Sequence, residues 1–484
     1  MNYKMVGRLI GLILALEAVF MLPALGFALF DGNSRTALAF LFTILLCLAV
    51  GAVLRRIARG AKPGFYAREG FVCVGMSWIV MSVLGCLPFF LSGEIPNYID
   101  ALFEMVSGFT TTGASIVPAV EELSRGVLYW RSFSHWLGGM GVLVFLMAVL
   151  PISGRNDGFA MHLLRAESPG PNVGKLVPRM RKTATLLYFM YILLTLVDIL
   201  FLLAGGMPWF DALCTAFGTA GTGGFGIKND SMASYSPYLQ DVCTVFMFLF
   251  GVNFTCYYLL LMRRVKSVLR DEELRLYLGF AVGSVVLISF NIRGLYDTLA
   301  ETIRHAAFQV SSIMTTTGFA STDFDRWPSF SKSILLALMV VGACAGSTGG
   351  GIKCARVLLL FKSLRRNIRQ TLYPQKVQVI RVNDQMVDEK VVSGTNSYLA
   401  AYTIITVLSF VIISLDGFSV ATNFSAVLAC FNNIGPGIEA VGPLCSYAGY
   451  GPLSKLVLIV DMLAGRLEIF PILILLSRST WRRH

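Results

Sequence analysis

Four short segments of this sequence place glycine beside threonine or asparagine between long apolar runs. Residues 110–115 read TTTGAS, residues 219–224 read TAGTGG, residues 315–320 read TTTGFA and residues 432–437 read NNIGPG. Glycine adopts backbone angles that aim successive carbonyl oxygens the same way, and threonine adds a hydroxyl that braces or lines such a loop. Carbonyl oxygens converging from several loops replace the hydration shell of a bare cation. The segments therefore predict cation-binding loops.

Each loop contributes three candidate residues. We take Gly113, Gly223, Gly318 and Gly435 as the equivalent positions of the four loops. A single loop of this kind is equally well explained as a helix C-terminal cap followed by a turn. Four copies, each lying between two apolar spans, favour one common site over four unrelated caps. The candidate residues are Thr111, Thr112, Gly113, Gly221, Thr222, Gly223, Thr316, Thr317, Gly318, Asn433, Ile434 and Gly435.

The composition indicates that these loops belong to a membrane protein. The chain has 484 residues, of which 55% are hydrophobic and 14% are charged, and its mean hydropathy is +0.69. Apolar stretches of about 20 residues, the length that crosses a bilayer as a helix, recur along the whole chain. We expect an all-α polytopic membrane protein with spans near residues 8–30, 36–55, 70–92, 128–150, 183–205, 238–262, 274–291, 331–363, 397–415 and 453–477.

The basic residues predict the orientation of these spans. The formal net charge is +12, and Lys and Arg cluster after every second predicted span, which is the pattern of cytoplasmic loops. We therefore expect both termini in the cytoplasm and exclude nucleic-acid binding as the reason for the charge. The ten cysteines show no CxxC or Cys/His spacing, so we expect buried apolar side chains and neither metal ligands nor disulfides.

A fourfold internal repeat follows the first two spans. In each copy a span leads into a short half-helix, a glycine loop and a second span. We expect the half-helices to begin near Asp100, Asp211, His305 and Asn423, with polar caps, and to lie on the outer side. Non-helical backbone at membrane depth needs protein or water around it, so the loops are expected to converge on one axis. The connection 370–396 is expected to hold a short strand or hairpin. The predicted units are an N-terminal transmembrane hairpin at 1–62 and pore repeats at 63–160, 161–270, 271–380 (with a broken second helix) and 381–484.

Glycines interrupt the eighth predicted span. Helix-breaking glycines in mid-membrane predict an unwound, mobile segment that gates the pathway, and a simple kink at a close helix contact is the alternative. A Walker A phosphate loop is excluded, because Ile352 precedes Lys353 and Cys354 follows it. The candidate gate residues are Gly346, Ser347, Thr348, Gly349, Gly350, Gly351 and Lys353, together with Arg466 of the tenth span.

Arg466 is a charge within an apolar span, which is costly and therefore a candidate functional residue. Aligning the second spans places Gly139-Met140 beside Gly465-Arg466 and the glycine-rich segment at the same level. We expect Arg466 to meet that segment on the axis below the loops, where a guanidinium repels a cation. The alternative is a structural ion pair with Glu468 or Asp461.

Taken together, these residues resemble the superfamily of K⁺ transporters that comprises Trk, Ktr and HKT proteins. The four loops, the amino-terminal hairpin and the segments GSTGGGIK (346–353) and AGRLEIFP (464–471) are most similar to the membrane subunits (TrkH/TrkG) of bacterial Trk potassium-uptake systems. The resemblance covers essentially the whole chain. It implies four M-P-M (span–pore helix–span) units around a pseudo-fourfold pore, with one pore per subunit of a homodimer in the bacterial inner membrane.

The resemblance also implies roles for the candidate residues and for a partner. The loops would form a K⁺ selectivity filter, with the glycine segment and Arg466 as the gate. A cytoplasmic TrkA-like subunit with RCK domains that bind NAD(H) or ATP/ADP would regulate it, and no nucleotide site is expected on this chain. The second and fourth loops depart from TTTG, and each repeat has one key glycine, so we expect looser selection of K⁺ over Na⁺ than in a TVGYG filter, with Rb⁺ also passing.

The sequence therefore predicts a protein that takes up K⁺ across a membrane and has no enzymatic activity. Its spans are expected to contact membrane lipid. A rival hypothesis is a secondary transporter of another solute that binds at broken helices in the midplane. Such a transporter is expected to aim half-helix N-termini at its substrate and to have paired inverted repeats, whereas this repeat is fourfold and parallel. An enzyme is disfavoured because the chain has only four histidines and no carboxylate pair or nucleophile constellation.

Overall fold

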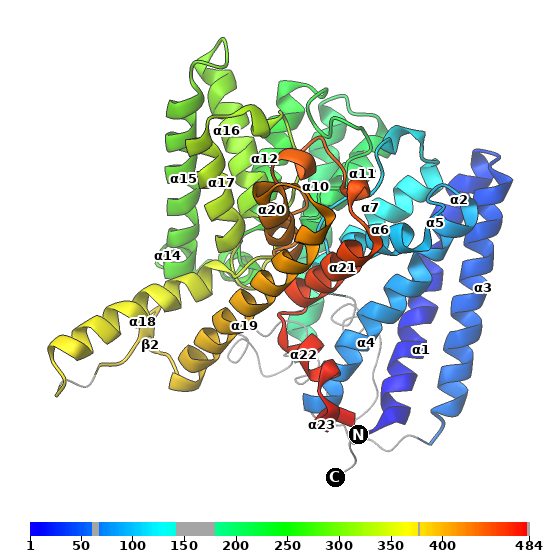
Figure 1. The fold of residues 1–484 in the computed structure, drawn as a ribbon, viewed down its shortest axis with the longest axis horizontal. Coiled ribbons are helices and arrows are strands. Elements are labelled where there is room, and N and C mark those ends of the chain that lie inside the picture. Colours follow the sequence, from blue (N-terminus) through cyan, green and yellow to red (C-terminus); the bar gives the residue numbers. More distant parts are fainter. Residues whose placement is uncertain (61–66, 142–179, 376–377, 482–484) are drawn as a thin grey trace.

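The protein is built almost entirely from helices. The computed structural model describes residues 1–60, 67–141, 180–375 and 378–481. In Figure 1, long helices flank a centre that is filled by shorter helices and loops. The last helix, α23 (Arg478–Trp481), lies beside the N-terminal helix, where the Tyr3 hydroxyl donates to the Trp481 carbonyl oxygen at 3.1 Å.

Within the described residues, six segments are long and apolar enough to cross a membrane: Tyr3–Phe30, Ser34–Ile57, Arg68–Ser92, Thr185–Ala204, Glu272–Ile292 and Glu389–Asp416. They match the first, second, third, fifth, seventh and ninth predicted spans. The helices that form them are α1 (Tyr3–Phe20), α2 (Leu22–Phe30), α3 (Ser34–Ile57), α4 (Ala67–Gly85), α5 (Leu87–Ser92), α10 (Met180–Ala204), α15 (Glu272–Ile292) and α19 (Glu389–Ile413).

The other four predicted spans are not continuous helices. As predicted, the glycine segment separates α17 (Ser329–Val341) from α18 (Cys354–Leu372). The predicted spans at 238–262 and 453–477 are also divided. The first of these divides into α12 (Pro237–Phe250) and α13 (Phe254–Leu261), bent by 88°; the second divides into α21 (Pro452–Arg466) and α22 (Phe470–Leu476).

Local backbone chemistry explains these two breaks. The Asn253 side chain accepts the Thr255 N–H at 2.9 Å and so begins a new helix immediately after α12. After α21, Glu468 and Ile469 both have positive φ, at 60° and 66°, which no α-helix contains. A third helix, α7 (Arg125–Gly139), also ends early, before Gly141 at φ 80°; the rest of the predicted span 128–150 lies outside the described residues.

Four short helices precede the glycine loops: α6 (Tyr98–Phe109), α11 (Trp209–Gly221), α16 (Leu299–Met314) and α20 (Val420–Phe431). Each begins earlier than predicted. Asn97, Thr298 and Ser419 cap three of them with side-chain oxygens, and α11 follows Pro208 without a side-chain cap. Asp100 and Asp211 lie instead in the first turn, where a carboxylate also favours the positive end of a helix.

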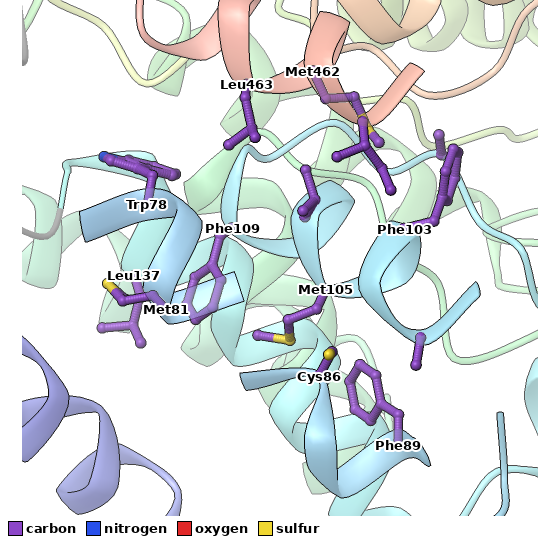
Figure 2. Packing of buried hydrophobic residues seen from close by; sticks show 14 of the residues in the cluster. Trp78, Met81, Cys86, Phe89, Phe103, Met105, Phe109, Leu137, Met462 and Leu463 are labelled. Carbon is purple, nitrogen blue, oxygen red and sulfur yellow. The ribbon is translucent and has the colours of Figure 1, made fainter. Parts of the chain in front are cut away.

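Close packing holds α6 in place. Lipid provides little hydrophobic force between helices, so fit between side chains must fix a short helix of this kind. Figure 2 shows Phe103, Met105 and Phe109 of α6 surrounded by side chains from neighbouring helices, and all of them belong to one buried cluster. The surrounding side chains that the figure labels are Trp78, Met81, Cys86, Phe89, Leu137, Met462 and Leu463.

The remaining elements connect these helices. The predicted hairpin in 370–396 is present: β1 (Arg381–Val382) pairs antiparallel with β2 (Gln385–Met386). Helix α14 (Val265–Leu269) leads into α15. All ten cysteines are free. The predicted burial is confirmed for nine of them, whereas Cys445 is exposed. No cluster of potential metal ligands occurs among the residues described here.

Candidate cation site at four glycine loops

The loops after the four short helices share one backbone conformation. In each, a left-handed residue is followed two positions later by a left-handed glycine. The first set is Thr111, Thr222, Thr316 and Asn433, with φ of 55°, 50°, 60° and 55°. The second set is Gly113, Gly224, Gly318 and Gly435, with φ of 77°, 75°, 85° and 96°.

A matching hydrogen bond fixes the correspondence between the loops. The residue between the two left-handed positions donates its N–H to the carbonyl oxygen five residues earlier. The pairs are Thr112 to Ser107 at 2.9 Å, and Gly223 to Gly218, Thr317 to Ser312 and Ile434 to Ala429, each at 2.8 Å.

This correspondence corrects the predicted register of the second loop. The sequence alignment placed Gly223 opposite Gly113, whereas the structure places Gly224 there and Gly223 opposite Thr112. Gly221 is the last residue of α11, so the loop starts one residue later than predicted. The candidate residues of the other three loops keep their predicted register.

The four left-handed glycines form a closed ring with carbonyl oxygens of the neighbouring loops. A Cβ built on Gly113 would collide with the Gly223 oxygen, one on Gly224 with the Thr317 oxygen, and one on Gly318 with the Ile434 oxygen. The ring closes at the fourth loop, where a Cβ on Gly435 would lie 2.7 Å from the Thr112 oxygen. A side chain at any of these positions is therefore excluded by space as well as by φ.

A cavity opens at one face of this ring. It has a volume of about 360 Å³ and is lined by all four left-handed glycines. The side chains of Arg131 and Lys228 reach the same cavity. The four loops therefore meet around one space, as the sequence predicts for a common site.

Hydrogen bonds of threonine and asparagine side chains stabilise the loops. The hydroxyls of Thr110 and Thr112 lie 2.7 Å apart, and those of Thr315 and Thr317 lie 2.8 Å apart. In the fourth loop, Nδ2 of Asn433 donates to the Thr112 hydroxyl and to the Met462 carbonyl oxygen, both at 2.9 Å. Asparagine thus joins the fourth loop to the first.

The glycine-rich segment between α17 and α18 contacts the third and fourth loops. The Gly350 N–H donates to the Thr316 hydroxyl at 2.6 Å, and a Cβ on Gly350 would contact the Asn432 carbonyl oxygen. Lys353, itself left-handed at φ 80°, donates its ammonium to the Gly349 carbonyl oxygen. Three further glycines of this segment, Gly342, Gly346 and Gly351, have positive φ.

The glycine-rich segment is also hydrogen-bonded to residues at the junction of α12 and α13. The Phe254 N–H donates to the Gly346 carbonyl oxygen at 3.0 Å, and the Cys344 N–H to the Gly251 oxygen at 3.1 Å. The Thr348 hydroxyl donates to the Phe250 carbonyl oxygen at 3.3 Å. Within the segment, the Ser347 hydroxyl donates to the Cys344 carbonyl oxygen at 2.6 Å.

Arg466 joins this segment to α7. Its guanidinium donates to the carbonyl oxygens of Thr348 at 2.8 Å and of Gly138 and Gly139 at 2.6 Å each. Arg466 and the segment therefore meet at one level, as predicted from the sequence. The two acids considered as its partners make other contacts: Glu468 pairs with Arg356, and Asp461 accepts from Ser409 at 2.7 Å.

The predicted alignment of second spans is one residue out. A Cβ on Gly138 would contact the Phe109 carbonyl oxygen, and one on Gly465 the Phe431 oxygen. Phe109 and Phe431 are the last residues of α6 and α20, so Gly138 corresponds to Gly465. Arg466 therefore corresponds to Gly139 and not to Met140.

Comparison with known proteins identifies the family. Residues 37–482 match the family TrkH, described as a cation transport protein. The chain belongs to the TrkH family.

Relatives and a solved structure agree with this assignment to the TrkH family. The chain is 36% identical to the Trk system potassium uptake protein TrkH of Salmonella typhimurium over 491 residues, which cover all of both chains. It is 35% identical to TrkG of Escherichia coli over 488 residues, 99% of each chain. The crystal structure of the potassium transporter TrkH from Vibrio parahaemolyticus superposes with a TM-score of 0.88 at 33% identity over the full length of both chains. These relatives are potassium transporters and not enzymes, in agreement with the sequence prediction.

An ion pair that was not predicted from the sequence supports the first and second loops in this TrkH-family protein. Arg131 of α7 and Glu104 of α6 are both buried and pair with one another. Glu104 also accepts the Ile116 N–H at 2.8 Å, while Arg131 donates to the Gly226 carbonyl oxygen at 2.8 Å and lies 3.6 Å from the centre of the Phe225 ring. The pair thus joins the first loop to the second. A charged residue within each apolar segment was the available signal, because such charges are rarely placed in a membrane without a role.

Proposed function

We propose that this protein is the ion-conducting subunit of a Trk-type potassium-uptake system. The closed ring of four glycines and neighbouring carbonyl oxygens around one cavity carries the proposal. Each of the four short helices ends at this ring, so the negative ends of four helix dipoles favour a cation at its centre. Backbone carbonyl oxygens held in this way replace the water around K⁺. The relatives' names, which describe Trk potassium uptake, support the choice of ion.

The proposed filter consists of the left-handed residues and the residues between them. Relative to the sequence prediction, Gly224 joins the set and Gly221 leaves it. Four M-P-M units around a pseudo-fourfold axis follow from this proposal, preceded by the N-terminal hairpin and with the repeat boundaries given above. The filter lies on the outer side, and the glycine segment and Arg466 form the gate below it.

Location and partners are part of the same proposal. The relatives are Trk proteins of Salmonella typhimurium and Escherichia coli, which favours a bacterial inner membrane, and the basic clusters favour cytoplasmic positions for both termini. The Trk system named for the relatives implies a regulatory partner, which we propose to be a TrkA-like cytoplasmic RCK subunit that binds NAD(H) or ATP/ADP. A homodimer with one pore in each subunit completes the assembly. Midplane binding of another solute is less well supported, since helix C-terminal ends and not N-terminal ends face the centre.

Rb⁺ uptake tests the proposed function directly. Proteoliposomes that contain the purified protein with its regulatory subunit should accumulate radioactive Rb⁺, and external K⁺ should compete with it more strongly than Na⁺. The absence of uptake from correctly inserted, partner-loaded protein would refute the transport function. Uptake that K⁺ does not inhibit would refute the choice of ion.

The gate proposal predicts a role for Glu273 of α15. This buried carboxylate accepts the N–H groups of Ala345 at 2.5 Å and Ala355 at 3.1 Å through the same oxygen, so it holds both ends of the glycine segment. Glu273→Ala should loosen the segment and raise Rb⁺ flux without partner stimulation about tenfold, since hydrogen bonds to a charged group contribute ~1.5–3 kcal/mol. Glu272→Ala is the matched control, because the neighbouring carboxylate pairs with Lys362 instead. Equal Rb⁺ flux in the Glu273→Ala and Glu272→Ala variants would contradict this role of Glu273.

A further inference from the structure

The second loop differs from the others at the position between its two left-handed residues. That position holds Thr112, Thr317 and Ile434 in the first, third and fourth loops, but Gly223 in the second. Backbone conformation does not require glycine here. Gly223 is not among the residues with positive φ, and its three counterparts carry side chains in the same hydrogen-bonded turn. Space is therefore the reason for the glycine.

The ring of His135, from α7, fills the space beside Gly223. The three atoms nearest to a Cβ built on Gly223 are Cγ, Nδ1 and Cδ2 of His135, the last at 2.6 Å. His135 is fully buried, and its ring centre lies 4.2 Å from that of Phe225. A side chain from the first repeat thus occupies the volume that a threonine or isoleucine side chain enters in the other loops.

Both ring nitrogens of His135 are used. The Phe225 N–H donates to Nε2 at 3.2 Å, so Nε2 is the acceptor. Nδ1 then carries the proton and donates to the Gly108 carbonyl oxygen at 2.7 Å. Gly108 lies in the last turn of α6, and Phe225 directly follows Gly224. The neutral imidazole therefore ties the end of the first short helix to the second loop.

We propose that His135 is a positioning residue that sets the cation selectivity of the second loop by replacing the side chain that Gly223 lacks. The inference rests on the proposed function of these loops as a filter. The Gly223 carbonyl oxygen is the one that faces Gly113 in the ring, so a void behind Gly223 would let that oxygen move. Selection between cations depends on where such oxygens are held, and it should therefore weaken while transport persists.

A double-variant experiment separates this role from a general requirement for folding. The variants are His135→Ala, Gly223→Thr and the two combined, with competition of K⁺ and Na⁺ against Rb⁺ uptake as the measurement. Either single change should lower the preference for K⁺ over Na⁺ about tenfold. His135→Ala leaves the buried Gly108 carbonyl oxygen and Phe225 N–H without the imidazole that they contact, and Gly223→Thr makes the new side chain collide with the His135 ring. The double variant should recover most of the lost preference, because a threonine side chain at position 223 fills space that the removed imidazole leaves beside the loop.

Two further variants serve as controls. His135→Gln should keep nearly the original preference, since an amide supplies one donor and one acceptor. Gly283→Thr, on α15 where no atom lies within 4 Å of a Cβ, should change nothing. An unchanged preference in His135→Ala, or a double variant no better than Gly223→Thr, would overturn the proposal. If the single variants do not fold, a double variant with a preference below that of His135→Gln would overturn it equally. Failure of the proposed function would appear differently, as absent Rb⁺ uptake in the unmodified protein.

Discussion

Replacing Gly224 by serine should abolish the preference for K⁺ while leaving the protein in the membrane. The new Cβ would collide with the Thr317 carbonyl oxygen, and φ of 75° is a conformation that L-residues adopt at a cost of roughly 1–2 kcal/mol. The loop must move to relieve the collision, and the carbonyl oxygens of two neighbouring loops move with it. We expect competition of K⁺ against Rb⁺ uptake to fall at least tenfold relative to Na⁺, because a shift of 1.4 kcal/mol suffices for that factor.

Control variants test whether this effect belongs to the ring. Gly113→Ser and Gly318→Ser should behave like Gly224→Ser, since both glycines face a carbonyl oxygen in the same way. Gly279→Ser, on α15, meets no atom within 4 Å of its Cβ and has no positive φ, so its selectivity should stay close to that of the unmodified protein. Unchanged K⁺ and Na⁺ competition in all three ring variants would exclude the ring as the filter.

The second loop is a case in which the sequence pattern does not determine the register. TTTG at 110–113 and 315–318 fixes the register because a single glycine follows three threonines. In the second loop, Gly223 and Gly224 are adjacent, and either could be aligned with Gly113. The choice depends on where α11 ends and on the ring of His135, which lies far away in sequence. Neither feature leaves a local signal, so the alignment was one residue out.

Hydropathy located six of the ten predicted spans as apolar segments long enough to cross a membrane among the described residues, but it did not show which spans are interrupted. A window average reports how apolar a segment is, and it cannot detect a bend at Asn253 or two left-handed residues at Glu468 and Ile469. The break at 342–353 was predictable because glycine itself carries the signal. The sequence predicted that Arg466 meets the glycine segment, but not which atoms it contacts. The three carbonyl oxygens to which it donates lie where they do because of helix ends that the sequence does not reveal.

Arg466→Ala should increase Rb⁺ flux in the absence of stimulation. The guanidinium donates to three carbonyl oxygens, those of Thr348, Gly138 and Gly139. In the proposed pathway, its charge would oppose a cation that leaves the filter: two unit charges 4 Å apart interact by about 4 kcal/mol at an effective dielectric constant of 20. Even a fraction of that energy changes flux by tenfold or more. Removal of the side chain also releases the glycine segment from α7, so both effects act in the same direction.

A conservative replacement distinguishes the charge from the contacts. Arg466→Lys keeps the positive charge but loses the planar fork that reaches several oxygens at once, so it should keep flux low if repulsion dominates and raise it if the contacts dominate. Asp461→Asn is the matched control within α21, because Asp461 contacts Ser409 and not the glycine segment. Loss of folded protein in Arg466→Ala, with Arg466→Lys and Asp461→Asn intact, would assign Arg466 a structural role and remove it from the gate. Increased flux in the alanine variant alone would make the guanidinium the barrier that a K⁺ ion meets after the filter.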